Sequence, residues 1–427
     1  MKRVFEKSTS QLRRAEQTIP LGAQTFSKSR TQYPVGYAPL FASKGKGCHL
    51  WDIDGNRYVD LVAALGAVTI GYRNHRIDSA VRKQMKSGVT FSLSGVIESE
   101  VSELLLSLLP NAEMVRFAKN GSDVTSAAVR LARHITGKKK VVRSSYHGWH
   151  DWYIGSTSRN FGVPNEISDL TLVLPFNDLA TAEDLFLRYG DEISCIILEP
   201  VGMEFPVTGF LEGLRKLCDS YGALLIYDEV VTGFRISKNG AGKLFHVEPD
   251  LSCFGKGIAN GFPLSAIVGK RLFMRELSEV FFSGTFGGET LSLAAAKEVL
   301  TMIKDGEVID QLRNAGNELS NRVTELLDFY QIDFLQLSGH DAWKFLKWNL
   351  DSEIADQTKT LFLQEMFQQG ILILNTHNVM TSMSHRHIDR VVNAYDRILP
   401  VLKDAVSTRD FGKYLKAEPI RPLFKLR

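Results

Sequence analysis

The chain has 427 residues, more than one hydrophobic core usually serves, so two domains are expected. Its hydrophobic fraction of 44%, charged fraction of 23% and net charge of +3 are those of an ordinary globular protein near charge balance. We see no basic stripe with interleaved aromatics, no apolar run near the roughly 18 residues of a membrane span, and no apolar core of a secretory signal at the N-terminus. These features argue against nucleic acid or a membrane as a partner.

The four cysteines are scattered and lie mostly in apolar surroundings. They are Cys48, Cys195, Cys218 and Cys253. This distribution argues for reduced thiols in the cytoplasm, and against both a disulfide framework and a metal site. Cys253 lies close to Lys256, but a thiol inside an apolar run is better explained as part of the core.

The first 65 residues contain few long regular elements. A helix-like run breaks at Pro20 and Gly22, and the following GAQTFSKSRTQYPVGY is rich in Gly, Ser and Pro. Two alternating runs then flank Asp54-Gly55-Asn56, which predicts a β-hairpin. The apolar stretch LVAALGAVTIGY leads into a helix-like run through Arg82.

Strand-like and helix-like runs alternate through the middle of the chain. The predicted strands are MVRFAK, KVVRSSY, LTLVLP, ISCIILEP, ALLIYDE, LSCFG and LSAIVGK. Between them lie helix-like runs such as VTSAAVRLARHITG, ending at Gly137, and FLEGLRKLCDSYG, ending at Gly222. This order predicts a mostly parallel sheet with right-handed crossovers.

The C-terminal part predicts a smaller α/β domain. It has the alternating WKFLKWNL, a helix-like TKTLFLQEMFQQG, a strand-like ILILN and a closing helix capped near Ser384. The tail, with its basic residues and two prolines, is expected to be a surface extension. We therefore predict an N-terminal segment, 1–65, that contributes to the small domain, a large domain over 66–305, and a C-terminal small domain over 306–427.

An acid and an amine end two of the predicted strands. Asp228 and Glu229 close ALLIYDE, and Lys256 follows LSCF. Ligands of open α/β sheets bind at the carboxyl ends of strands, so these groups are aimed into one crevice. A lysine amine forms Schiff bases with carbonyls, and an acid can pair with a pyridinium nitrogen. Taken singly, each residue favours the structural interpretation, a solvated lysine or a helix cap; together with the flanking residues they favour a cofactor site.

A glycine turn precedes the helix that ends at Gly137. Asn120-Gly121-Ser122-Asp123 joins a strand to that helix, so amide groups and the positive end of the helix dipole can converge on an anion. A simple helix cap is the alternative.

These motifs together resemble a known family. IYDEVVTGFR followed by FGKGIANGFPLSAIVG is similar to the fold-type I pyridoxal phosphate (PLP) enzymes called class III aminotransferases, in the branch that includes glutamate-1-semialdehyde aminomutase. The resemblance runs from about GAQTFSKS to SMSHRHIDR. It implies an α/β fold with a mostly parallel, seven-stranded type of sheet in the large domain, and a smaller α/β domain from the two chain ends.

The resemblance also implies roles for individual residues. Lys256 would hold PLP and move a proton during catalysis, and Asp228 would keep the pyridine nitrogen protonated. The other residues expected at the cofactor are Gly121 and Ser122 at the phosphate, Tyr146 against the ring, His147 in the adjoining turn, and Glu204 near the ring hydroxyl. Thr285 would reach the phosphate in a neighbouring subunit, so a homodimer with shared active sites is expected.

The sequence leaves open the role of one group of polar residues and raises a metal site as a possible role for another. Ser27, Lys28 and Arg30 are either substrate contacts or part of a polar surface loop. His147, His150 and Asp151 could suggest a metal site, but no further ligand follows at a suitable spacing, so none is expected.

The reaction is expected to be two-substrate transamination. The segment GSTSRNFGVP is shorter than the glycine-rich lid of related aminomutases, and Leu65 stands where those relatives carry an aromatic. L-Glutamate is the expected donor and a keto or aldehydo sugar-like compound the expected acceptor. Glutamate-1-semialdehyde 2,1-aminomutase activity is the alternative, and a non-catalytic PLP-binding sensor is a further one.

Overall fold

The computed structural model describes residues 3–421, which divide into two compact units. The large unit is His75–Ile309. The terminal unit combines the described residues up to Asn74 with those from Asp310 onward. No helix within the described range is long and apolar enough to cross a membrane.

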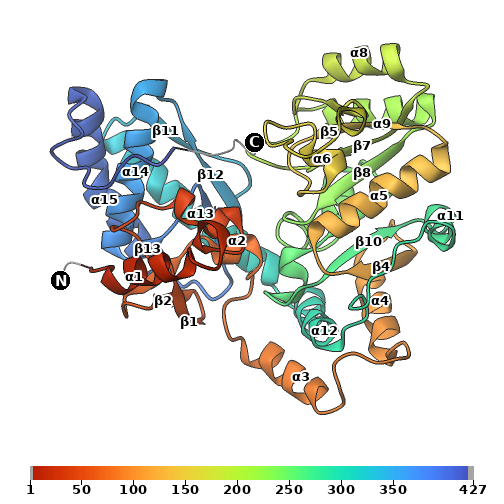
Figure 1. The fold of residues 1–427 in the computed structure, drawn as a ribbon, viewed down its shortest axis with the longest axis horizontal. Helices are drawn as coiled ribbons and strands as arrows, with labels where there is room; N and C mark the ends of the chain where they lie inside the picture. Colours follow the sequence, from red (N-terminus) through yellow and green to blue (C-terminus); the bar gives the residue numbers. More distant parts are fainter. Residues whose placement is uncertain (1–2, 422–427) are drawn as a thin grey trace. The chain divides into compact units, whose positions relative to one another are not determined.

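The large unit is built on a seven-stranded sheet with the order β4-β10-β9-β8-β7-β5-β6 (Figure 1). The strands are β4 (Met114–Ala118), β5 (Lys140–Ser144), β6 (Thr171–Val173), β7 (Ile193–Leu198), β8 (Leu224–Glu229), β9 (Leu251–Phe254) and β10 (Ser265–Gly269). The run from β9 to β6 is parallel, whereas β10 is antiparallel to both β9 and β4. The predicted fold class is confirmed.

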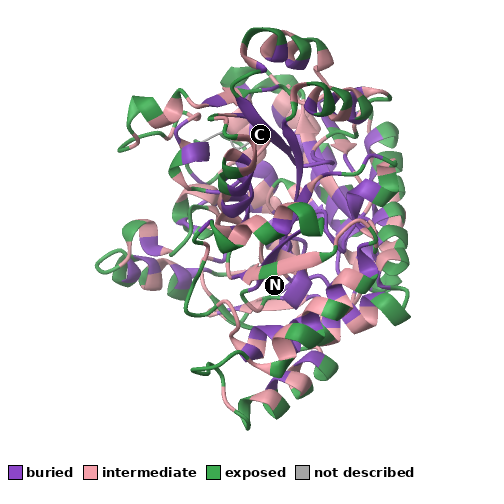
Figure 2. Cartoon of the chain, turned by 90° about the vertical axis from the view of Figure 1, so that its right-hand side faces the viewer, coloured by how far each residue is buried: buried purple, intermediate pink, exposed green. Residues whose placement is uncertain are grey.

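Both faces of this sheet are covered, which explains why its strands are continuous apolar runs. Cys195 and Ile197 of β7 pack on the side of α5 (Gly121–Thr136), while the intervening Ile196 and Leu198 pack with α8 (Leu179–Tyr189) and α9 (Phe210–Tyr221). Figure 2 shows the central strands as buried.

The large unit contains further helices. They are α3 (His75–Met85), α4 (Val96–Leu108), α6 (Asp151–Ile154), α7 (Asn165–Ser168), α10 (Gly240–Phe245), α11 (Arg271–Met274) and α12 (Thr290–Asp305), with the 3₁₀ turns η4 (Lys256–Ala259) and η5 (Arg275–Ser278). Of these, α4, α10 and α11 contact strands of the sheet and α3 packs on α12. Helices α5 and α9 end at Gly137 and Gly222, whose φ angles of 69° and 61° suit glycine. Both helix ends are where the sequence predicts them.

The terminal unit contains two small sheets. One has the order β1-β2-β3-β13, from β1 (Ala42–Lys46), β2 (His49–Asp52), β3 (Arg57–Asp60) and β13 (Ile371–Leu372); the other has the order β11-β12-β14, from β11 (Leu335–Ser338), β12 (Trp343–Trp348) and β14 (Thr376–Asn378). The helices are α1 (Glu6–Ala15), α2 (Ala63–Gly66), α13 (Val308–Phe329), α14 (Ser352–Gln369) and α15 (His385–Thr408), and three 3₁₀ turns lie at η1 (Pro20–Gly22), η2 (Phe26–Lys28) and η3 (Arg30–Gln32).

The predicted hairpin is the antiparallel pair β2 and β3. Its turn residue Asp54 accepts hydrogen bonds from the backbone N–H groups of Lys7 and Ser8 at 2.7 and 2.9 Å. These are first-turn donors of α1, which have no partner within the helix. The hairpin turn therefore holds the N-terminus of α1.

The apolar stretch after β3 forms a left-handed turn. Ala63, Ala64 and Leu65 have φ angles of 49°, 51° and 61°, a region that side chains with a Cβ disfavour. The buried Asp60 accepts from the N–H groups of Val62 and Ala63 at 2.7 and 3.0 Å and holds the entry to the turn. Sequence periodicity does not reveal this geometry.

The predicted surface extension at the C-terminus is described through Arg421, and in this part it lies mostly exposed but is attached to the protein at a few points. Phe411 and Ala417 are buried, and the Gln364 side-chain oxygen of α14 accepts from the N–H groups of Lys416 and Ala417 at 2.8 and 3.2 Å. A few apolar residues spaced along a polar segment are enough to attach it.

Candidate active site

The acid and the amine singled out in the sequence lie on neighbouring strands. Asp228 on β8 is paired in register with Cys253 on β9, and Lys256 follows three positions later. Lys256 has a φ of 43°, unusual for a residue with a Cβ. Such outliers persist only where the surroundings impose them and they cluster at functional sites.

Asp228 is buried and shares a hydrogen bond with an imidazole. Its Oδ2 lies 2.8 Å from Nδ1 of His147, and its Oδ1 accepts from the N–H of Val230 at 3.0 Å. Nε2 of His147 lies 2.8 Å from the carbonyl oxygen of Ser144. Both ring nitrogens thus face oxygen atoms, so the imidazole is held between the Asp228 carboxyl group and the backbone at the end of β5.

This imidazole is fixed from several sides. Its ring stacks on Trp152 with centroids 6.1 Å apart, and it meets Tyr153 edge-on at 5.6 Å. The neighbouring Tyr146 is half-buried and also meets Tyr153 edge-on, at 5.4 Å. The turn after β5 therefore presents an aromatic ring next to the histidine that orients Asp228.

The glycine turn that begins α5 packs against the turn after β5, which contains Tyr146, His147 and Gly148. Gly148 has a φ of 108°, and a Cβ placed there would lie 2.2 Å from Oγ of Ser122. Thr125 of α5 donates to the carbonyl oxygen of His147 at 2.9 Å. Ser122 lies in the first turn of α5, where N–H groups and the helix dipole favour an anion.

Val230 joins these two parts of the site. A Cβ at Gly121 would lie 2.9 Å from its side chain, and a Cβ at Gly255 would lie 3.2 Å from it. The glycine before Lys256 and the glycine that opens α5 therefore both pack on the residue two positions after Asp228. The structure thus brings Gly121, Ser122, Tyr146, His147, Asp228 and Lys256 into one region of the large unit.

The other predicted residues are placed differently. Thr285 is exposed and lines a cavity of about 870 Å³ in the large unit, together with Phe91 and Lys119. Glu204 is exposed in the loop after β7. Ser27, Lys28 and Arg30 belong to the terminal unit, where Arg30 pairs with Glu16 at 2.6 Å.

The pairing of His147 with Asp228 is the contact that sequence reasoning missed, since it assigned the histidine only to a turn. The signal available was a histidine just after one parallel strand and an acid at the end of another. Strand order, which decides whether the two meet, is not visible in the sequence.

The residues present fit PLP. The turn where Gly148 leaves space for Ser122 can take an anion, Tyr146 offers an aromatic face, and Asp228 is a carboxylate suited to a protonated ring nitrogen. Lys256 supplies an amine for an aldehyde.

A second buried carboxylate follows Asp228. Both carboxylate oxygens of Glu229 accept a hydrogen bond from the backbone N–H of Ala241, at 2.9 and 3.0 Å from its nitrogen. This hydrogen bond favours the charged form, but burial outweighs it and raises the pKa of Glu229 to about 7. Between pH 4.5 and pH 7 the native state therefore binds more protons than the unfolded chain, so stability falls as the pH rises through this range.

Replacing this group tests that linkage. Glu229→Gln keeps an acceptor for Ala241 but does not ionise, so it should match the wild type near pH 4.5 and gain relative stability up to about pH 7, reaching about 3 kcal/mol. Urea unfolding at several pH values measures this. Glu279→Gln, at an exposed position, should show no such trend. Equal pH profiles for Glu229→Gln and the wild type would contradict the assignment.

Comparison with known proteins agrees with this chemistry. The family model "Aminotransferase class-III" matches residues 32–398. The chain is 34% identical over 425 residues to a glutamate-1-semialdehyde 2,1-aminomutase of Aquifex aeolicus, covering 94% of this chain and 99% of that one. It is 36% identical over 392 residues to a 3-aminobutyryl-CoA aminotransferase of Cloacimonas acidaminovorans, covering 90% and 93%.

A solved structure shares the fold. The FumI protein of Sphingopyxis sp. MTA144, in its PLP internal aldimine form, superposes with a TM-score of 0.88 at 26% identity, covering 97% of this chain and 99% of that one. The chain therefore belongs to the class III aminotransferases, and it is a PLP-dependent enzyme.

Proposed function

We propose that Lys256 and Asp228 carry the chemistry of this enzyme. Bound PLP supplies an aldehyde that bonds to amines and a ring that accepts electrons from the adjacent carbon. Lys256 would anchor it and then move a proton to and from the carbon that carries the amine. Asp228, held by His147 at 2.8 Å, would keep the ring nitrogen protonated.

The remaining predicted contacts belong to the same proposal. Gly121 and Ser122 would bind the phosphate through the first turn of α5, and Tyr146 would stack on the ring. Glu204 would approach the ring hydroxyl. His147 is a positioning residue, because it acts through Asp228.

The first candidate reaction is that of glutamate-1-semialdehyde 2,1-aminomutase, in which an amino group moves between adjacent carbons of one substrate. The supporting observation is the Aquifex relative of that name, which aligns over almost the whole of both chains. This differs from the preference for two-substrate transamination drawn from the sequence.

Two-substrate transamination is the second candidate. Leu65 lies in a strained left-handed turn where related aminomutases carry an aromatic, and a relative of equal similarity is named as an aminotransferase. L-Glutamate as donor and a sugar-like keto or aldehyde acceptor, with Ser27, Lys28 or Arg30 as carboxylate partners, belong to this candidate.

A second copy of the chain is the proposed partner. Phe281, Phe286 and Leu93 of the large unit are 79%, 58% and 83% exposed, and Phe286, Leu93 and Thr285 line the same cavity. Exposed apolar groups gathered at a hollow mark an interface, and Thr285 would then complete the partner's phosphate site. Sedimentation equilibrium of the PLP-loaded protein should give twice the chain mass. A stable monomer at micromolar concentration would refute the shared site.

A cytoplasmic location is part of the same proposal. All four cysteines are free and buried, as expected for thiols in a reducing compartment. Cell fractionation that recovered the protein outside the cytoplasm would overturn it.

A substrate assay decides between the two reactions. The holoenzyme is given glutamate-1-semialdehyde alone, and the isomer with the amino group on carbon 1 is measured. We expect conversion without any added donor or acceptor. Conversion that occurs only when an amino donor and a separate carbonyl acceptor are supplied would replace the first candidate by the second.

Variants of two lysines connect turnover to the site. Lys256→Ala should lower turnover by about 100- to 10,000-fold, because it removes the proton-transferring group. Lys270→Ala changes an exposed lysine at the end of the next strand, β10, and should leave turnover unchanged. Full activity in Lys256→Ala would remove the basis of the proposed mechanism.

A pair of glycine variants tests the phosphate turn. Gly148→Ala forces a Cβ to within 2.2 Å of Oγ of Ser122, so Ser122 must shift; we expect PLP affinity to fall by roughly tenfold or more. Gly162→Ala is the control, since Gly162 also has a positive φ, 84°, but a Cβ added there would meet no atom within 4 Å. Equal PLP affinities in the two variants, measured by cofactor titration, would exclude a steric role for Gly148.

A further inference from the structure

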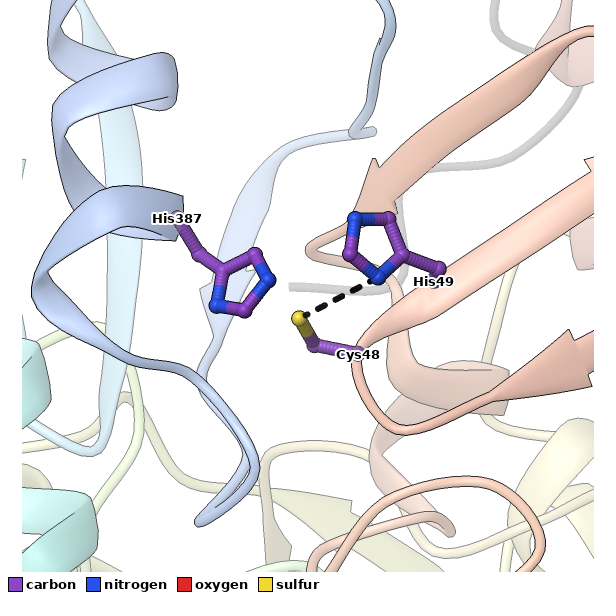
Figure 3. Close-up of side chains that lie close together, drawn as sticks. All are labelled: Cys48, His49 and His387. Atoms are coloured by element: carbon purple, nitrogen blue, oxygen red, sulfur yellow. Dashed lines mark hydrogen bonds between the residues drawn. The ribbon is translucent and has the colours of Figure 1, made fainter.

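Three potential metal ligands meet in the terminal unit, whereas the residues proposed to anchor PLP belong to the large unit. Cys48 lies in the turn just before β2, His49 is the first residue of β2, and His387 lies in the first turn of α15. Figure 3 shows the Cys48 thiol between the two imidazole rings. The ligands come from opposite ends of the chain, so their spacing in the sequence gives no metal motif.

The distances are close to those of a coordination shell. Sγ of Cys48 lies 4.0 Å from Nδ1 of His49, and one ligand atom from each of the three residues lies within 4.8 Å of the others. The two imidazole rings meet edge-on, with centroids 4.9 Å apart. Ligand atoms around a tetrahedral zinc ion are about 3.5 Å apart. Small side-chain rotations would therefore bring the three ligand atoms to the spacing that a zinc ion requires.

His387 already has a partner for its second nitrogen. Its Nδ1 lies 2.9 Å from Oγ and 3.0 Å from the backbone N of Ser384, the residue that caps α15. In Figure 3 the other ring nitrogen points toward Cys48. Nδ1 now accepts a hydrogen bond from the Ser384 backbone N–H. A metal on the other nitrogen would require Nδ1 to take up the ring proton, so Nδ1 would give up that bond and donate instead to Oγ of Ser384.

We propose that Cys48, His49 and His387 form a zinc(II) site that ties β2 to the start of α15. Thiolate and imidazole are ligands that zinc prefers, whereas calcium and magnesium require oxygen. The neighbouring guanidinium groups of Arg57 and Arg390 oppose a dication, and the Cys48 thiolate offsets one of its two charges. Both histidines are half-buried, so a water molecule can complete a tetrahedron.

Cobalt(II) is a spectroscopic probe for this site. Tetrahedral cobalt with a thiolate ligand absorbs in the visible range at wavelengths longer than those of PLP. Adding cobalt to the full-length holoenzyme should give these bands at one ion per chain, and zinc should remove them by displacement.

Variants separate this site from other metal-binding groups. Cys48→Ser and His387→Gln should each weaken zinc binding by more than about 100-fold, since changes even to outer contacts cost about 10- to 100-fold. His385→Ala is the matched control: His385 lies two positions from His387, is exposed and pairs with Glu318. It should bind zinc as the wild type does. PLP stoichiometry and circular dichroism verify that each variant is folded.

Two results would overturn the proposal. One is the absence of cobalt binding, or cobalt binding without tetrahedral bands, either of which would exclude the proposed four-coordinate site. The other is zinc binding that persists in folded Cys48→Ser and His387→Gln, which would assign the metal to other groups. Neither readout depends on turnover, so the outcome is independent of the reaction that the PLP site performs.

Discussion

A buried carboxylate at the end of a central strand is the constraint around which the proposed PLP site is arranged. Asp228 lies on β8, between β7 and β9, and both faces of the sheet are covered. A charge in such a place is costly unless it is paired and hydrogen-bonded. His147 meets this need from the end of β5, two strands away, and its own position depends on the Ser144 carbonyl and on Trp152.

The same arrangement brings the anion-binding turn close to the acid. His147 and Gly148 are consecutive, so the turn that pairs with Asp228 also passes over Ser122 with no room for a side chain. Val230, just after Asp228, packs on Gly121 and on the glycine preceding Lys256. Changes at these glycines therefore affect several parts of the site at once.

Much of the fold follows from local patterns in the sequence. The seven strands of the large unit, the glycine ends of α5 and α9 and the hairpin of β2 and β3 are all predicted, because apolar periodicity and glycine turns act over a few residues. The reversed direction of β10 is not, since LSAIVG is as apolar as its parallel neighbours. The pairing of His147 with Asp228 and the cluster at Cys48 depend on which elements become neighbours, and neither was predicted.

The proposed PLP residues and the proposed substrate-side residues lie in different units. This separation offers a reason why members of one family can perform different reactions. Lys256, Asp228, His147 and Ser122, which we propose as parts of the PLP site, lie in the large unit. Leu65, where the resemblance implies a departure from aminomutases, and Arg30, a proposed substrate contact, lie in the terminal unit. The proton chemistry can therefore stay fixed while the terminal unit varies.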